Sequence, residues 1–165
     1  MLYTRRRCSG RENLREELDM EEVFQDRFEN LQATVARHEG YRKYMYKCPA
    51  GKTTIGYGTN LDAGLPEDEA RMLLSVRLIK LADELSVRIP WWGGLSEVRQ
   101  DVLINMAYQM GVEGLMGFKN ALAAMGREDW ATAEAEMLDS KWARSDSPNR
   151  AKELATIMRT GSDEN

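Results

Sequence analysis

The sequence lacks the features that would place the chain in a membrane or hold it together by covalent or metal links. No apolar run reaches about 18 residues, so no segment is predicted to span a membrane as a helix. The three arginines near the N-terminus are not followed by an apolar stretch, so we predict no signal peptide. Two cysteines, Cys8 and Cys48, are too few for a disulfide framework. With a single histidine, His38, they are also too few for a zinc site, and we expect neither a metal nor a cofactor.

The composition is that of an ordinary globular protein of one domain. Of its 165 residues, 42% are hydrophobic and 30% are charged, which is enough apolar material for a core without disulfides. The net charge of −4 argues against a nucleic-acid partner. Residues 1–20 show no apolar periodicity and are predicted to form a flexible extension, whereas residues 21–165 are predicted to form one domain.

The periodicity predicts mostly helices, with one glycine-rich interruption. Phe24, Phe28, Leu31 and Val35 share one face of a helix that should end near His38. The interruption, residues 40–62, is predicted to be a hairpin region. A helix from Pro66 to about Arg88 should follow, because proline suits the first turn of a helix and Pro90 stops it.

The second half of the chain is predicted to be helical with glycine breaks. Ser96 can cap a helix that carries Val98, Val102 and Met106 on one face, and breaks are expected at Gly111, Gly114 and Gly117. Further helices are predicted at 118–125, 128–140 and 149–159. Trp142 should be a core residue, and so should seven methionines: Met72, Met106, Met110, Met116, Met125, Met137 and Met158.

The stretch from Glu39 to Gly58, EGYRKYMYKCPAGKTTIGYG, combines an acid, a thiol and a hydroxyl. Eight residues separate Glu39 from Cys48, and five separate Cys48 from Thr54. Glycines among β-prone residues predict a small sheet with glycine-dependent turns. Such a sheet would fold Cys48 and Thr54 back toward the helix end that carries Glu39. We therefore expect the three side chains to lie around one cleft.

This stretch resembles the active-site signature of phage-type lysozymes, the family 24 glycoside hydrolases. In that family Glu, then Asp or sometimes Cys, then Thr follow one another at the same spacing. Cys48 stands where the commonest pattern has Asp, and Thr59 where several members have His. Later blocks, Asn105–Gly111, Gly117-Phe118 and parts of the segment from Trp142 to Gly161, resemble the family's helices, so the resemblance covers about residues 23 to 161.

The resemblance implies an α+β, mostly helical fold with a small lobe around a β-hairpin sheet. A long helix would join this lobe to a larger helical lobe. Glu39 would be the acid that protonates the leaving sugar oxygen, while Cys48 and Thr54 would hold the water that attacks with inversion.

Further residues are assigned supporting roles by the same resemblance. We expect Tyr108, Gln109 and Asn60 to bind substrate. Arg150 is expected beside Glu39, and Thr59 at a supporting position.

The implied function is that of a muramidase, which cleaves the β-1,4 bond between N-acetylmuramic acid and N-acetylglucosamine in bacterial peptidoglycan. It would be a phage-encoded monomer that serves host lysis or wall penetration, either from the host cytoplasm before lysis or as part of the virion. We expect peptidoglycan as its partner, and neither nucleic acid nor a membrane.

Two alternatives remain open. Because Cys48 replaces the Asp of the commonest family pattern, the chain could instead be a peptidoglycan-binding or structural module without catalytic activity. A cysteine peptidase or amidase would instead need His38 close to Cys48 in the fold. In an oxidising compartment, a Cys8–Cys48 disulfide would occlude the predicted cleft.

Overall fold

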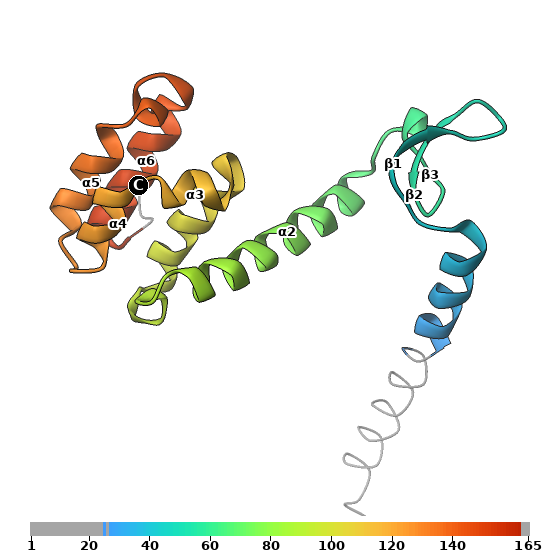
Figure 1. The fold of residues 1–165 in the computed structure, drawn as a ribbon, viewed down its shortest axis with the longest axis horizontal. Coiled ribbons are helices and arrows are strands. Elements are labelled where there is room, and N and C mark those ends of the chain that lie inside the picture. The colour runs from blue at the N-terminus through green and yellow to red at the C-terminus, as the bar shows by residue number, and fades with distance from the viewer. Residues whose placement is uncertain (1–24, 26, 163–165) are drawn as a thin grey trace, which may run out of the picture. The chain divides into compact units, whose positions relative to one another are not determined.

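The computed structural model describes residue 25 and residues 27–162, and the chain divides into two compact units, Met1–Pro66 and Glu67–Asn165 (Figure 1). The predicted flexible extension, residues 1–20, lies outside the described residues. The secondary structure is mostly helical with one three-stranded antiparallel sheet, which confirms the predicted α+β class. The sheet belongs to the first unit, and the second unit is helical.

The first unit contains a helix over residues 27–39 and the sheet that follows it. The strands β1 (Arg42–Lys47), β2 (Thr53–Gly56) and β3 (Thr59–Asn60) pair in that order, and the 3₁₀ helix η1 (Leu61–Ala63) comes directly after them. Thr54 lies in the middle strand, opposite Tyr46 on one side and Asn60 on the other. The predicted helix end near His38 and the predicted hairpin region at 40–62 are therefore confirmed.

The predicted apolar face of the 27–39 helix lines a hollow within the first unit. Phe28, Leu31 and Val35 lie along this hollow of about 660 Å³ together with Tyr57, which follows β2. Phe24, the first member of the predicted face, lies outside the described residues.

The second unit begins with α2 (Glu67–Arg88), the longest helix of the described chain. It starts directly after Pro66 and ends before Pro90, as predicted, with acidic residues in its first turn and Arg88 in its last. Both charge placements suit the helix dipole. Arg88 Nη1 also lies 2.6 Å from Glu113 Oε1, which ties the end of α2 to α3.

The other helices of this unit are gathered near the C-terminal end of α2 (Figure 1). They are η2 (Trp92–Gly94), α3 (Glu97–Met116), α4 (Lys119–Met125), α5 (Trp130–Leu138), the π-helical turn η3 (Trp142–Asp146) and α6 (Pro148–Thr160). All three predicted C-terminal helices are thus present. Ser96 occupies the N-cap position of α3, but its side chain makes no capping hydrogen bond.

The predicted chain breaks within residues 111–117 are only partly correct. Gly111 leaves helical geometry with φ 77° and ψ 162°, and Gly117 follows the end of α3. Gly114 is part of the helix, so the break predicted there is wrong. Glycine permits a break but does not impose one, because its backbone adopts helical angles as well as left-handed ones.

The core lies between the helices of the second unit. Its largest fully buried side chains are Leu85, Leu103, Met106, Leu115, Met125, Met137 and Met158, and Trp142 is also buried, as predicted. Met110 and Met116 pack against this core. Met72 does not: it is 70% exposed, because it projects from α2 away from buried Leu85. The prediction that Met72 fills the core is wrong.

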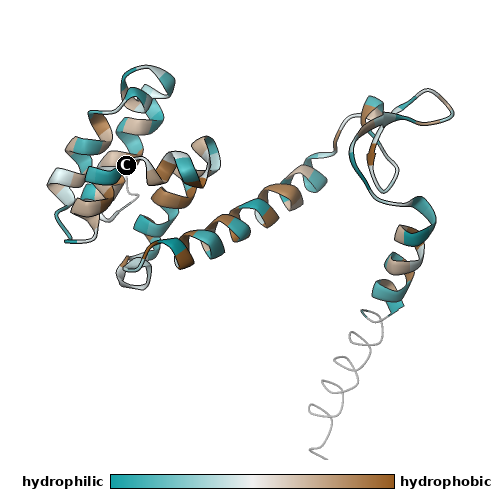
Figure 2. Ribbon diagram, viewed as in Figure 1, coloured by the Kyte–Doolittle hydropathy of each residue, from teal (hydrophilic) through white to brown (hydrophobic). Residues whose placement is uncertain are grey.

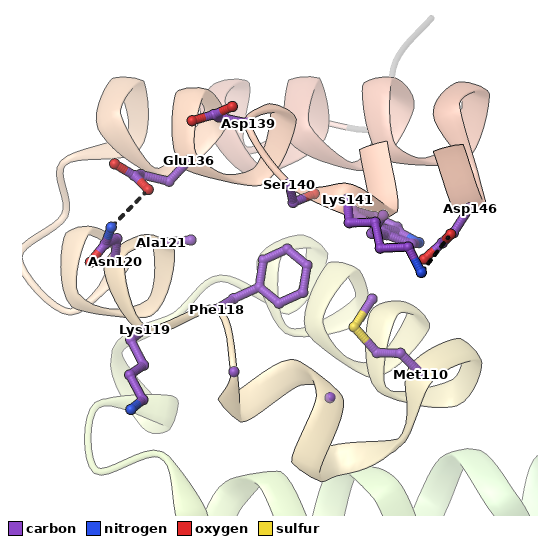
Figure 3. A pocket seen from close by; sticks show the side chains of 13 residues that line it. Met110, Phe118, Lys119, Asn120, Ala121, Glu136, Asp139, Ser140, Lys141 and Asp146 are labelled. Carbon is purple, nitrogen blue, oxygen red and sulfur yellow. Dashed lines mark hydrogen bonds and ion pairs between the residues drawn. The ribbon is translucent and has the colours of Figure 1, made fainter. Parts of the chain in front are cut away.

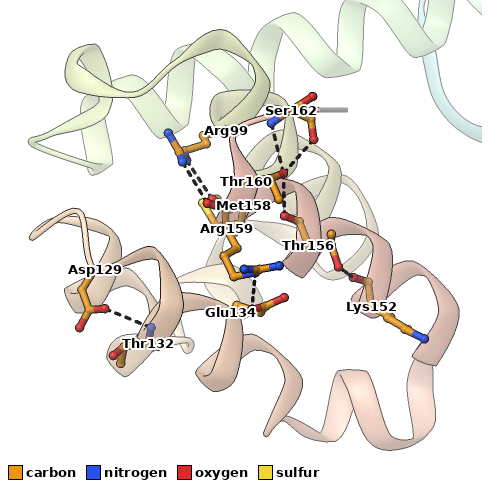
Figure 4. Close-up of polar contacts among 10 residues, drawn as sticks. All are labelled: Arg99, Asp129, Thr132, Glu134, Lys152, Thr156, Met158, Arg159, Thr160 and Ser162. Atoms are coloured by element: carbon orange, nitrogen blue, oxygen red, sulfur yellow. Dashed lines mark hydrogen bonds and ion pairs between the residues drawn. The ribbon is translucent and has the colours of Figure 1, made fainter. Parts of the chain in front are cut away.

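Arg99 of α3 forms hydrogen bonds with the backbone at the C-terminal end of α6 (Figure 4). Its Nε donates a hydrogen bond to the Met158 carbonyl oxygen at 2.9 Å, and Nη2 donates to that of Arg159 at 3.3 Å. The guanidinium also lies 3.8 Å from the ring centroid of Trp130. The Arg99 guanidinium therefore links α3 to α5 and also satisfies backbone carbonyl groups at the end of α6, which have no partner within that helix.

Candidate active site

Glu39 is the last residue of the 27–39 helix, and the backbone turns sharply after it. Gly40 adopts φ 69°, and its N–H donates to the Ala36 carbonyl oxygen at 3.0 Å. A left-handed residue after a helix is most readily glycine, because a Cβ is disfavoured there. The Glu39-Gly40 pair thus ends the helix and directs the chain into β1.

The carboxylate of Glu39 lies against the backbone of Gly58, in the turn between β2 and β3. A Cβ placed on Gly58 would lie 3.0 Å from Glu39 Oε2 and 3.6 Å from its Cδ. Gly58 also has φ 86°, a conformation that L-residues rarely adopt. Gly58 is therefore favoured by its backbone conformation, and a side chain at this position would also make the Glu39 carboxylate shift slightly. The sequence placed Gly58 in the motif without indicating this contact.

Cys48 and Thr54 meet around the backbone of the β1–β2 loop. The Cys48 N–H donates to the Lys52 carbonyl oxygen at 3.0 Å, and the Gly51 N–H donates to the Cys48 carbonyl oxygen at 2.8 Å. Thr54 Oγ1 donates to the same Lys52 carbonyl oxygen at 3.1 Å. Thr54 is only 4% exposed, whereas Cys48 is half-buried. A hydrogen bond with the Thr54 side chain also acts on the Cys48 thiol, so the two side chains lie side by side, whereas the cleft that they would share with Glu39 stays a prediction.

The loop also changes the acidity of the thiol. A hydrogen bond with the backbone of Lys52 is the main cause that lowers the pKa of Cys48 below its ordinary value. Desolvation opposes this shift, while the backbone of Ala50 and the Thr54 side chain add to it. A lowered pKa makes the thiolate more abundant near neutral pH. His38 is not among the groups that perturb Cys48, so the shift gives no support to a Cys/His nucleophile.

Asn60 and Asp62 form hydrogen bonds around the β3 side of the sheet and the η1 turn. Asn60 Oδ1 accepts a hydrogen bond from the Asp62 N–H at 3.1 Å and so caps η1. Asp62 Oδ2 accepts from the Thr53 N–H at 3.0 Å, and this contact lowers the pKa of Asp62. Part of the hydrogen-bonding capacity of Asn60 is therefore used within the fold. Thr59 pairs with Ile55 and is exposed.

The sequence reasoning missed Asp62. The cap that Asn60 forms is recognisable in the sequence, because Asn side chains commonly accept a hydrogen bond from the backbone N–H two residues later, but nothing local indicates that Asp62 reaches the Thr53 N–H.

In the second unit, Gln109 serves as a polar link between helices. Its Oε1 accepts a hydrogen bond from Trp142 Nε1 at 2.9 Å, and its Nε2 donates to Ser147 Oγ. Buried Trp142 thereby has a partner for its indole N–H, as such a group requires. Both ends of the Gln109 amide are engaged, although the residue itself remains exposed.

Tyr108 and Arg150 line one hollow of the second unit. This hollow of about 570 Å³ lies between α2, α3 and α6, and its other lining residues are Leu74, Leu78, Asp101, Ile104 and Asn105. Tyr108 is 41% exposed. The structure thus brings together two of the predicted residues of this unit. The predicted pairing of Arg150 with Glu39 joins residues of different units and stays a prediction.

A second hollow of about 500 Å³ opens beside Phe118 (Figure 3). The Phe118 and Trp142 rings meet edge to face with their centroids 6.0 Å apart. Charged and polar groups surround them: Asn120 Nδ2 donates to Glu136 Oε2 at 3.1 Å, and Lys141 Nζ lies 3.6 Å from Asp146 Oδ1. Aromatic side chains at the bottom of a hollow, with polar groups around them, are common in ligand-binding sites.

The described residues offer no group of three or more His, Cys, Asp or Glu side chains that could hold a metal ion. None of the helices in the described part of the chain is both long and apolar enough to cross a membrane.

Comparison with known proteins identifies the family. Residues 36–160 match the family described as Phage lysozyme, and they include Glu39, Cys48, Thr54 and Arg150. The match covers more than half of the chain, so the chain belongs to the phage lysozyme family.

Three relatives illustrate the range of this similarity. "Probable T4-type lysozyme 1" of Dictyostelium discoideum is 36% identical over 67 residues, which is 41% of this chain and 39% of that protein. "Pre-baseplate central spike protein Gp5" of Enterobacteria phage T4 is 39% identical over 72 residues, 44% of this chain and 12% of that protein. "Probable T4-type lysozyme 2" of Dictyostelium discoideum is 25% identical over 153 residues, 74% of this chain and 89% of that protein. The chain therefore spans well under half of the first two relatives.

Proposed function

We propose that this chain is a muramidase that hydrolyses the β-1,4 bond between N-acetylmuramic acid and N-acetylglucosamine in bacterial peptidoglycan. Glu39 donates a proton to the leaving sugar oxygen. Cys48 and Thr54 hold the water that attacks from the opposite face, and the anomeric configuration inverts. This assigns the chain to the family 24 glycoside hydrolases, in a variant with Glu, Cys and Thr as its catalytic set.

One observation carries the proposal: the carboxylate of Glu39 lies beside Gly58, in the turn that follows the strand β2, and the Thr54 side chain of that strand forms a hydrogen bond with the Cys48 thiol of the β1–β2 loop. A general acid needs a defined position relative to the bond that it cleaves. The exposed Glu39 carboxylate is open to a polymeric substrate.

The lowered pKa of the Cys48 thiol supports its proposed role at the position where the commoner family pattern has Asp. A thiolate can accept a proton from water, as the carboxylate of the commoner family pattern would. The hydrogen bonds from the loop and Thr54 favour that charged form. Cys48 is therefore proposed as the base that orients and activates the water.

Substrate binding is proposed for Asn60 in the first unit and for Tyr108 and Gln109 in the second. The hollow that Tyr108 shares with Arg150 supports this role. Arg150 and Thr59 are proposed as supporting residues.

The family suggests where the protein acts. We propose host lysis or wall penetration by a phage, with peptidoglycan as the partner and a monomer as the active form. One relative is named a central spike protein of a phage, which supports a virion-associated version of this role. In the lysis version the protein would act from the host cytoplasm.

A second candidate, a peptidoglycan-binding module without turnover, is favoured by the thiol at position 48. The two candidates differ in whether the Glu39 carboxyl group is needed beyond binding.

The test compares wild type with Glu39→Gln on purified bacterial cell walls. Turbidity loss should fall by about 10²–10⁴-fold in the variant, because the amide has the same shape but cannot act as the acid. Binding to insoluble walls, measured by co-sedimentation, should persist. Glu29→Gln, an exposed change on the same helix, is the matched control and should keep full activity. Retention of more than about a tenth of the lysis rate by Glu39→Gln would contradict the assignment. Wall binding by the wild type without any lysis would favour the binding module instead.

A further inference from the structure

The β1–β2 hairpin carries a local excess of positive charge. It contains four cations, Arg42, Lys43, Lys47 and Lys52, which we call the hairpin cations, and none of the residues 40–61 is acidic. The whole chain has a net charge of −4, so its other parts carry more acids than cations. Hydrophilic residues mark the strands of this sheet in Figure 2. Positive charge is therefore concentrated on one hairpin of a chain that is acidic as a whole.

The hairpin cations are not neutralised by ion pairs among the described residues. None of the four forms a salt bridge in the part of the chain that the structure describes. The Arg42 guanidinium lies 5.4 Å from the ring centroid of Tyr46, and Lys47 Nζ donates a hydrogen bond to Thr53 Oγ1 at 2.8 Å. Both of these contacts are with uncharged partners, so they leave the positive charges uncompensated.

Two acids border the hairpin cations in the sequence. Asp62 follows β3, and its Oδ2 accepts a hydrogen bond from the Thr53 N–H. Hydrogen bonds with Thr53 lower the pKa of Asp62, and the positive charge of Lys47 adds to this shift. Glu39 precedes the hairpin and acts in its protonated, uncharged form as the proposed general acid. Four cations thus face at most two negative charges, and the local charge stays positive.

Two of the hairpin cations adjoin the proposed catalytic pair, Cys48 and Thr54. Lys47 directly precedes Cys48, and its partner across the strand pair is Thr53, the neighbour of Thr54. The Lys52 carbonyl oxygen accepts hydrogen bonds from both the Cys48 N–H and Thr54 Oγ1. This neighbourhood lies wholly within the first unit. A substrate that reaches Cys48 and Thr54 therefore comes within the distance, about 10 Å, over which charges still act at 0.1 M salt.

We propose that the hairpin cations bind the carboxylates of peptidoglycan, so that the chain prefers wall polymers with free peptide carboxylates over those with amidated ones. This inference rests on the proposed function, because it concerns the substrate of that same site. The peptides attached to N-acetylmuramic acid end in carboxylates. Lys47 and Lys52 bind those nearest the bond to be cleaved, and Arg42 and Lys43 extend the cationic surface along β1. Opposite charges on protein and polymer raise the rate of encounter and select the partner.

The experiment compares two forms of the same purified cell walls, from which acid has removed the phosphate-containing polymers. In one form the carboxylates are free, and in the other a carbodiimide and methylamine have converted them to methylamides. At low salt and at wall concentrations below KM, wild type should lyse the free-carboxylate form about three- to tenfold faster. Addition of about 0.3 M salt should remove most of this preference, because salt screens charges at a protein surface.

Charge substitutions locate the preference on the hairpin. Lys47→Gln combined with Lys52→Gln should remove most of the preference by raising KM for free-carboxylate walls, with little change in kcat. Lys47→Arg combined with Lys52→Arg keeps both charges and should keep the preference. Arg127→Gln combined with Lys152→Gln removes two cations from exposed positions outside the hairpin. This matched control should behave as wild type, and circular dichroism confirms that each variant is folded.

A binding measurement separates this inference from the proposed hydrolysis. Glu39→Gln should bind free-carboxylate walls more tightly than amidated walls in co-sedimentation, and the double glutamine change should abolish the difference. This result does not require turnover. Absence of lysis by wild type together with this binding preference would contradict the hydrolase function and leave the role of the hairpin cations intact.

Three results would overturn the proposal. Equal binding and lysis of the two wall forms, or a preference that survives the double glutamine change, would show that the hairpin cations do not recognise carboxylates. A preference lost equally in the control pair would assign it to the total charge of the chain. A preference that appears only on walls that keep their phosphate-containing polymers would assign the cations to phosphate instead.

Discussion

At the residue scale, the close approach of Glu39 to Gly58 makes the glycine testable apart from its backbone conformation. Gly58→Ala places a Cβ 3.0 Å from Glu39 Oε2 and also forces alanine into φ 86°. We expect a loss of about 1 kcal/mol or more in the free energy of unfolding, together with a measurable loss of wall lysis because the carboxylate must shift away from the added Cβ. Chemical denaturation and the turbidity assay measure the two effects.

Gly64 supplies the matched control for this change. Its φ of 83° gives similar strain, but no atom lies within 4 Å of the Cβ position. Gly64→Ala should therefore lose stability and keep lysis. Equal loss of lysis in both alanine variants would mean that the contact with Glu39 has no special role.

Also at the residue scale, the lowered pKa of Cys48 predicts how its reactivity depends on pH. The acid form is a neutral thiol, so a lowered pKa means that the thiolate forms at lower pH than in the unfolded chain. Alkylation by iodoacetamide in a Cys8→Ser background should therefore reach half its maximal rate at lower pH in the native protein than in the denatured protein. Thr54→Val should move that midpoint upward, because one stabilising hydrogen bond is lost. A native midpoint at or above the denatured one would contradict the observed geometry.

The same reagent tests the role of the thiol in lysis. Alkylated protein should be inactive, whereas Cys48→Asp should keep activity and resist the reagent, because a carboxylate can replace a thiolate as the base. Full lysis by protein in which mass spectrometry shows complete modification of Cys48 would remove the thiol from the mechanism.

At the element scale, the end of α6 depends on a side chain from α3. Arg99→Ala removes two hydrogen bonds to the Met158 and Arg159 carbonyl oxygens and the contact with Trp130. We expect a loss of roughly 1.5–3 kcal/mol in the free energy of unfolding. Urea denaturation measures it, with Lys152→Ala, an exposed change on α6, as the control. A loss no larger than that of the control would show that solvent satisfies these carbonyls equally well.

At the scale of the whole molecule, residues 1–19 are predicted to contribute little. Their lack of apolar periodicity means that they have little surface to bury. Deleting them should leave lysis unchanged and shift the melting temperature by less than about 5 °C, the shift expected from roughly 1 kcal/mol in a domain of this size. Differential scanning calorimetry of the two chains decides the point, and a larger drop would reveal a packed element in this segment.

Much of the architecture follows from local signals in the sequence. Pro66 and Pro90 bound α2 because proline acts on its immediate neighbours in the backbone. Gly40 ends the first helix for an equally local reason, and the glycines among β-prone residues indicated the sheet that carries Thr54. Gly114 shows the limit of such signals, because glycine permits a break without imposing one and this residue remains helical while Gly111 does not.

The sequence by itself determined the bounds of α2 and the end of the first helix, since these depend on residues that are close along the chain, and its resemblance to a family indicated the fold class and the candidate catalytic set. Only the tertiary structure decided that the Glu39 carboxylate lies on Gly58 and that the Gln109 amide is taken up by Trp142 and Ser147. It also decided that Met72 faces outward rather than into the core. The physical reason is common to all three: burial and long-range hydrogen bonds depend on which sides of distant elements meet, and hydrophobicity alone does not specify that.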